Sequence, residues 1–173
     1  MDPSTVEKKS DNEEALMSDA APKIGRKMSF TSAGMAFGAF PDKANMCEPT
    51  INAALYFSRC PSVANLLPLA AKLLEYERCT GIPMGTKGKN DWKVQIVDCQ
   101  PGDMIRTVSV KDDDELHKAI EDGMSTTCRR EGLPWWEFVR VENESGDSAV
   151  VARFDHTIGD GLSLVKLMEQ VLT

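Results

Sequence analysis

The sequence contains no long apolar run and no excess of basic residues, and each absence excludes a class of protein. No stretch approaches the roughly 18 to 20 uninterrupted apolar residues of a membrane-spanning helix. Residues 1–23 lack the apolar centre of a signal peptide. Lys and Arg number 20 against 27 Asp and Glu, a net charge of -7, so binding to a nucleic-acid backbone is disfavoured. We therefore expect a cytosol-facing protein that binds no nucleic acid.

Cysteine and histidine are too few and too scattered for a structural cross-link or metal site. The five cysteines are odd in number, form no C-x-x-C pair, and are accompanied by only two histidines. A disulfide framework or zinc site needs paired, closely spaced ligands. We expect no metal, and five buried or half-buried thiols: Cys47, Cys60, Cys79, Cys99 and Cys128.

The composition is that of an ordinary globular protein. Hydrophobic residues make up 42% and charged residues 27% of the 173 residues, enough for one domain or one half of a larger fold. Residues 1–28 mix charges of both signs with Ser, Asn and Pro and form no apolar face. This predicts a disordered tail over 1–28 and a folded domain over 29–173.

The first half of the predicted domain alternates strands and a helix. Thr50–Ser58 follows Pro49 and predicts a strand, and Pro61-Ser62 is a helix-start signal. Apolar residues then recur at helical spacing up to Gly81, with Pro68 predicting a kink or a later helix start. The glycine-rich segment Gly81–Asn90 lacks the spacing of a nucleotide-binding loop and predicts a flexible basic turn.

The next segments predict two strands and a second helix. Trp92–Val97 and Met104–Val110 have strand character, and a helix is expected from Glu115 to about Thr127. The three acidic residues 112–114 precede that helix. Carboxylates at this position cap a helix more often than they bind a metal, so we predict a cap. We expect His117 to lie on the solvated surface of this helix.

The last third predicts a hairpin followed by a helix. Trp135–Val141 and Ser148–Phe154 are strands joined by a short polar segment, so they should pair antiparallel. An apolar helix follows from Leu162 to Leu172. The fold class is therefore mixed α+β, a mixed sheet with flanking helices, without the strict alternation of a dinucleotide-binding fold.

One imidazole stands where this hairpin meets the last helix. His156 is followed four and five residues later by Asp160 and Gly161. Histidine suits a general base at neutral pH, and a turn after a strand can present it to a cleft. Gly159 would let the turn bend and Gly161 would leave room for a ligand. On these residues alone, a catalytic site and an ordinary Asp-Gly turn are equally favoured.

The residues around this motif resemble those of the wax ester synthase/diacylglycerol acyltransferase family. Leu133–Glu137 and Phe154–Gly161 match, in order and approximate spacing, its Pro-Leu-Trp strand, hairpin and H-H-x-x-x-D-G motif, and Asn52–Phe57 is similar to an early strand of that family. The resemblance covers about residues 29 to 173 and is specific over roughly the last forty. Asp155 stands in place of the first histidine, while His156 keeps the second, which is catalytic in the family.

The resemblance implies a chloramphenicol acetyltransferase-like fold of two similar halves with the active site in a tunnel between them. It implies transfer of a fatty acyl group from acyl-CoA, the co-substrate, to a long-chain alcohol or diacylglycerol, with no cofactor. His156 and Asp160 would be catalytic, with Asp160 held by Arg106, Arg140 or Arg153, and substrate would contact Asp155 and Gly161. Such substrates suggest peripheral attachment to the endoplasmic reticulum, the plasma membrane or lipid droplets.

The sequence is compatible with three alternatives. The chain corresponds to the N-terminal half of the family's fold, which predicts an inactive fragment or a half completed by a C-terminal half or a homologous partner. A non-catalytic interaction module derived from an acyltransferase fits the same residues. So does an acyltransferase that makes esters or amides of small metabolites.

Overall fold

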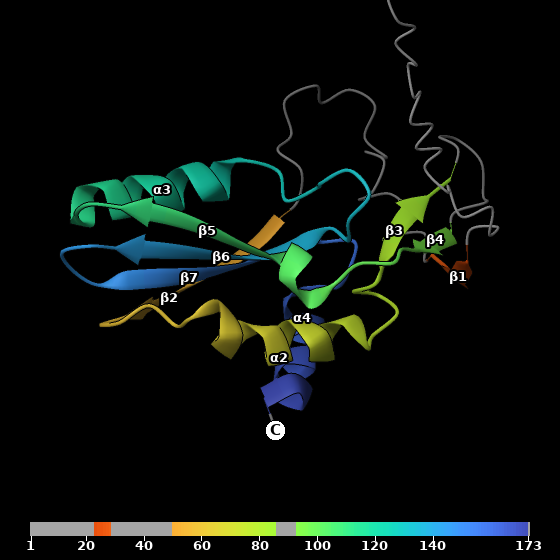
Figure 1. Ribbon diagram of the computed structural model, residues 1–173. Helices are drawn as coiled ribbons and strands as arrows, with labels where there is room; N and C mark the ends of the chain where they lie inside the picture. Colours follow the sequence, from red (N-terminus) through yellow and green to blue (C-terminus); the bar gives the residue numbers. More distant parts are fainter. Residues whose placement is uncertain (1–22, 29–49, 86–92, 173) are drawn as a thin grey trace, which may run out of the picture.

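The structure, a computed structural model, describes residues 23–28, 50–85 and 93–172. Its centre is a four-stranded sheet in the order β2-β7-β6-β5, with helices on both faces (Figure 1). A separate sheet of three short strands, β1-β4-β3, lies beside it. The predicted mixed sheet with flanking helices is confirmed.

The central sheet is built around the predicted hairpin. β6 (Trp136–Asn143) and β7 (Ser148–Asp155) pair antiparallel, and β2 (Thr50–Phe57) pairs antiparallel with the far side of β7. β5 (Ile105–Val110) joins β6 in parallel, which makes the sheet mixed. A single turn of 3₁₀ helix, Pro101–Met104, precedes β5, so Met104 lies outside the strand in which it was predicted.

One face of the sheet is covered by α3 (Asp113–Ser125). Asp112 accepts a hydrogen bond from the Glu115 backbone N–H at 2.9 Å, so the predicted acidic cap is confirmed at that residue. Leu116 and Ile120 of the helix are buried against valines and alanines of β6 and β7. His117 is exposed, as expected, and its Nδ1 lies 2.7 Å from the Asp113 carbonyl oxygen.

The opposite face is covered by α2 (Val63–Leu74) and α4 (Gly161–Leu172) (Figure 1). Ser62 caps α2 and exchanges hydrogen bonds with Asn65, which confirms the predicted helix start. Pro68 lies inside this helix, so the alternative of a later start is wrong. The core on this face is aromatic and aliphatic and includes Leu66, Leu73, Met104, Trp136, Phe138, Phe154, Ile158 and Leu164.

The small sheet corrects two predictions. Gly81–Met84, expected as part of a flexible turn, form β3 and pair antiparallel with β4 (Lys93–Ile96). Gly81 allows close pairing, because a Cβ there would lie 1.9 Å from Val94 Cγ1. Residues 86–90 of that turn lie outside the described part of the chain.

The predicted tail is also corrected at its end. Ile24–Lys27 form β1, which pairs with β4, and Met28 is buried against Val94. β4 provides hydrogen-bond partners for the backbone of β1, and the residue pattern of this segment alone does not predict that pairing. Residues 1–22 and 29–49 lie outside the described residues, so the rest of the boundary between tail and domain stays a prediction.

The thiols whose placement is described are free and differ in burial. Cys79 and Cys128 are buried, and Cys60 and Cys99 are half-buried, which agrees with the prediction; Cys47 lies outside the described ranges. Within those ranges no helix is long and apolar enough to cross a bilayer, and no three metal-binding side chains cluster together.

Burial should make the thiols react in a defined order. Burial raises the pKa of Cys79 to about 12, so almost none of it is thiolate at about pH 8. We expect iodoacetamide to label Cys60 and Cys99 first, and Cys79 only after unfolding, as followed by mass spectrometry of the peptides. Labelling of Cys79 in the native chain as fast as Cys60 would contradict the packing described here.

Candidate functional site

The H-x-x-x-D-G segment forms the turn between β7 and α4. β7 ends at Asp155, His156 to Ile158 form the turn, and α4 begins at Gly161. The Ile158 backbone N–H donates to the Asp155 carbonyl oxygen at 3.0 Å, which closes the turn. His156 is half-buried in this turn, so its ring is not enclosed in the core.

Asp160 caps the helix that follows the turn. Its Oδ1 accepts a hydrogen bond from the Ser163 backbone N–H at 2.8 Å, and its carbonyl oxygen accepts one from the Leu164 N–H at 2.9 Å. Hydrogen bonds from Ser163 lower the pKa of Asp160, and electrostatic interaction with His156 and Arg78 lowers it further. Asp160 is therefore a stable carboxylate that fixes the start of α4 and lies within electrostatic range of His156.

Asp155, the residue in place of the family's first histidine, is fully buried. Its Oδ2 accepts a hydrogen bond from Arg129 Nε at 2.6 Å, and its Oδ1 accepts one from the Thr157 backbone N–H at 2.9 Å. Arg129 also lies over the ring of Trp135, with its guanidinium carbon 4.3 Å from the ring centroid. Asp155 thus fixes the backbone on which His156 lies, through its bonds to Arg129 and to the Thr157 N–H. In this structure its role is positional.

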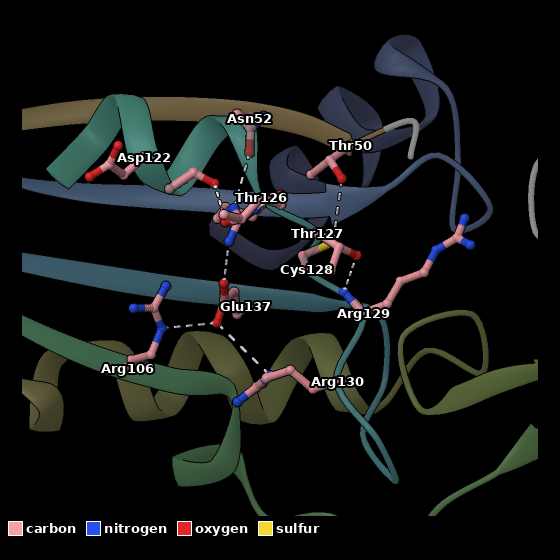
Figure 2. Close-up of polar contacts among 12 residues, drawn as sticks. Thr50, Asn52, Arg106, Asp122, Thr126, Thr127, Cys128, Arg129, Arg130 and Glu137 are labelled. Carbon is pink, nitrogen blue, oxygen red and sulfur yellow. Dashed lines mark hydrogen bonds and ion pairs between the residues drawn. The ribbon is translucent and has the colours of Figure 1, made fainter. Parts of the chain in front are cut away.

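A polar cluster with a buried ion pair at its centre lies on the same face of the sheet as α3, beyond the end of that helix (Figure 2). We define the Glu137 cluster as Asn52, Arg106, Arg130, Glu137 and Arg153. Arg153 Nη1 donates to Glu137 Oε1 at 2.6 Å, and these two side chains are only 1% and 3% exposed. Arg106 and Arg130 approach the other Glu137 oxygen at 3.4 and 3.9 Å. Arg153 also donates to the oxygens of Asn52 and Thr126.

None of the three arginines considered as a partner of Asp160 serves in that role in the structure. Arg106 and Arg153 bind Glu137. Arg140 donates to the Pro61 carbonyl oxygen at 2.6 Å and lies near Glu142. The carboxylate of Asp160 is satisfied by the start of its own helix, and its exposed position explains why no guanidinium is needed there.

The two glycines of the turn differ in what surrounds them. A Cβ at Gly159 would lie 3.0 Å from the Ser163 Cβ, so a close approach to α4 favours glycine there. A Cβ at Gly161 would meet no atom within 4 Å. The chain's own packing therefore does not require glycine at 161, and its role beside a ligand stays a prediction.

Sequence reasoning missed Arg78, Arg129 and Glu137. Glu137 could have been found, because the short hairpin loop fixes a register that places it opposite Arg153. A Glu and an Arg facing each other on the inward side of two buried strands predict a buried ion pair. Arg78 and Arg129 lie in segments between helices and strands, where the sequence gives no period by which to align them.

The chain is similar to known proteins in structure, whereas sequence comparison finds no match. No protein-family description matches the chain, and no curated protein matches its sequence. Solved structures do match. The condensation domain that mediates chain release from the enacyloxin polyketide synthase superposes with a TM-score of 0.60 at 14% identity, over 87% of this chain and 30% of that one.

Two further structures give the same result. The first condensation domain of the calcium-dependent antibiotic synthetase matches with a TM-score of 0.62 at 10% identity, over 86% of this chain and 37% of that one. SgcC5 of Streptomyces globisporus matches with a TM-score of 0.60 at 16% identity, over 85% of this chain and 35% of that one. The chain spans about a third of the length of these proteins, and at such identities the likeness shows the fold alone. The fold is therefore the mixed α+β type of condensation domains and chloramphenicol acetyltransferase-like proteins.

Proposed function

We propose that this chain takes part in the transfer of an acyl group from a thioester to a hydroxyl group, with His156 as the general base. The observation behind the proposal is the position of His156. It lies half-buried in an H-x-x-x-D-G turn that Asp155 anchors from the strand side and Asp160 from the helix side. The fold around the turn is of the condensation-domain type, which makes acyl transfer a natural function to test.

The chemistry needs no group beyond the imidazole and the two substrates. The neutral ring of His156 accepts the proton of the acceptor hydroxyl while its oxygen attacks the thioester carbonyl. The C–O bond forms, the C–S bond breaks, and the proton passes from the imidazole to the departing thiolate. No acyl-enzyme forms, because the bound alcohol is itself the nucleophile.

The finer assignment rests on the resemblance around the motif. By that resemblance the donor is acyl-CoA and the acceptor is a long-chain alcohol or diacylglycerol, giving a wax ester or a triacylglycerol without a cofactor. His156 is the proposed catalytic residue. Asp160, which the resemblance implies to be catalytic, is proposed to position the turn that carries His156. Gly161 would border the space in which the substrate lies, whereas Asp155, fully buried and bound to Arg129 and Thr157, is proposed to position the turn and not to contact substrate.

A complementary half is proposed to enclose this site. General-base catalysis needs a substrate held in place and shielded from water. On α4, directly after the motif, Leu162 is 76% exposed and Val165 is 57% exposed. A second half-domain, from the same polypeptide or a homologous partner, would cover these side chains and close the site.

The direct test follows labelled acyl groups from acyl-CoA. The chain, completed by a C-terminal half of the same polypeptide or by a homologous partner, is incubated with a long-chain alcohol, diacylglycerol, or small alcohols and amines, and the products are separated. Transfer to the lipid acceptors in preference to the small ones is the expected result. Preferential transfer to small alcohols or amines would contradict a lipid acceptor and would favour an acyltransferase that makes esters or amides of small metabolites.

A non-catalytic module is the second candidate, and the exposed apolar residues of α4 favour it as well. It predicts no transfer to any acceptor, together with self-association that weakens when Leu162 and Val165 are both replaced by Ser. That pair of results would reject the enzymatic proposal.

A further inference from the structure

A cavity of about 450 Å³ lies beside the catalytic turn, on the side of α4 that faces β1. We call it the α4 cavity; its charged lining comes from Arg26 of β1, Glu77 and Arg78 after α2, and Lys166 of α4. Among its lining residues there are three cations and one carboxylate. Aromatic and aliphatic side chains complete the wall: Tyr76, Ile158, Leu164 and Leu167.

The cations of this cavity are poorly compensated. Arg26 Nε is shielded from solvent and has no hydrogen-bond partner within the described part of the chain. Burial and the neighbouring charge of Arg78 lower the pKa of Arg26, and Glu77 only partly opposes them. The carboxylate of Glu77 meanwhile accepts a hydrogen bond from the Arg26 backbone N–H. Two guanidinium groups and an ammonium group that line one cavity with a single carboxylate favour a bound anion between them.

The α4 cavity is joined to the turn that holds His156. Arg78 Nη1 donates a hydrogen bond to the Ile158 carbonyl oxygen at 3.3 Å. Ile158 lies in the motif between His156 and Asp160, and Arg78 is near enough to Asp160 to lower its pKa. An anion held by Arg78 would therefore lie next to the catalytic turn.

We propose that the α4 cavity binds a phosphate monoester borne on an apolar or aromatic body. Arg26, Arg78 and Lys166 bind the phosphate, and Tyr76 and Leu167 pack against the body. Assigning this ligand to the nucleotide portion of the acyl-CoA donor rests on the proposed function. Phosphate recognition itself does not, because it follows from the charges and the cavity.

The test is calorimetric binding to the full chain, which needs no turnover. Adenosine 3′,5′-bisphosphate, adenosine and inorganic phosphate are compared. Arg26→Gln and Lys166→Gln are each expected to weaken binding of the bisphosphate about tenfold, since each removes a charged hydrogen bond. Glu77→Gln is expected to tighten it, because it removes the one opposing charge. Lys118→Gln, an exposed lysine on α3, is the matched control and should change nothing.

The outcomes distinguish phosphate binding as such from binding of the acyl-CoA donor. Bisphosphate binding that is tighter than that of inorganic phosphate, and that competes with acyl-CoA, assigns the cavity to the donor. Equal binding of the bisphosphate and inorganic phosphate supports the phosphate site and contradicts both the packing of an attached apolar body and the donor assignment. No binding of either anion, or binding that Arg26→Gln and Lys166→Gln leave unchanged in folded protein, overturns the proposal. Because no acyl transfer is measured, these results stand apart from those that test the proposed function.

Discussion

Replacing Glu137 with Leu should lower the free energy of unfolding by about 3 to 5 kcal/mol. Glu137 and Arg153 form an ion pair with an N–O distance of 2.6 Å between side chains that are almost wholly buried. Removing the carboxylate leaves the Arg153 guanidinium in the sheet with neutral oxygens only, from Asn52 and Thr126. A buried charge without its counter-charge is far more costly than the pair is beneficial.

Two further variants make this expectation specific. Glu142→Leu changes the same residue type on the same strand, but the Glu142 side chain is 50% exposed and 3.4 Å from Arg140, so a loss of at most about 1 kcal/mol is expected. The double change Glu137→Leu with Arg153→Met removes both charges and should recover much of the stability. Urea unfolding measures all three. Equal losses of unfolding free energy in Glu137→Leu and Glu142→Leu would show that the burial of the Glu137–Arg153 pair does not determine the cost of removing the carboxylate.

Most of the fold could be predicted because its signals are local. The hairpin of β6 and β7 follows from a short polar loop between two apolar strands, and α2 follows from Ser62 and a helical period. The strands that were missed, β1 and β3, have only four residues each. Such short strands are stabilised by pairing with β4, which is distant in sequence from β1 although not from β3, and they leave almost no periodic signal of their own.

The candidate site was predictable only in part, for a related reason. The motif residues His156 and Asp160 are contiguous enough to recognise, and the structure places both on one turn. Their partners come from elsewhere in the chain: Arg129 anchors Asp155 across 26 residues, and Arg78 reaches Ile158 across 80. Long-range contacts of this kind, one an ion pair and the other a hydrogen bond to a backbone carbonyl, depend on the tertiary fold, so the arginines considered for Asp160 by residue type alone bind other groups.

His156→Ala is expected to reduce kcat/KM for acyl transfer by about 100- to 10,000-fold, the usual contribution of a general base. The change should leave the free energy of unfolding nearly intact, because the ring is half-buried and the turn is held by Asp155 and Asp160. His117→Ala is the matched control. His117 is exposed on α3 and contacts a backbone oxygen of its own helix, so its loss should not alter transfer.

Added imidazole distinguishes a base from a structural support. If His156 accepts the hydroxyl proton, free imidazole should restore part of the transfer lost in His156→Ala, and more of it as the pH rises and imidazole becomes neutral. A ring that only shaped the turn would give no such rescue, because a diffusing molecule cannot restore the backbone. Wild-type turnover by His156→Ala would reject the general-base mechanism outright. Lost turnover without rescue, accompanied by a large fall in stability, would make His156 a structural residue of the turn.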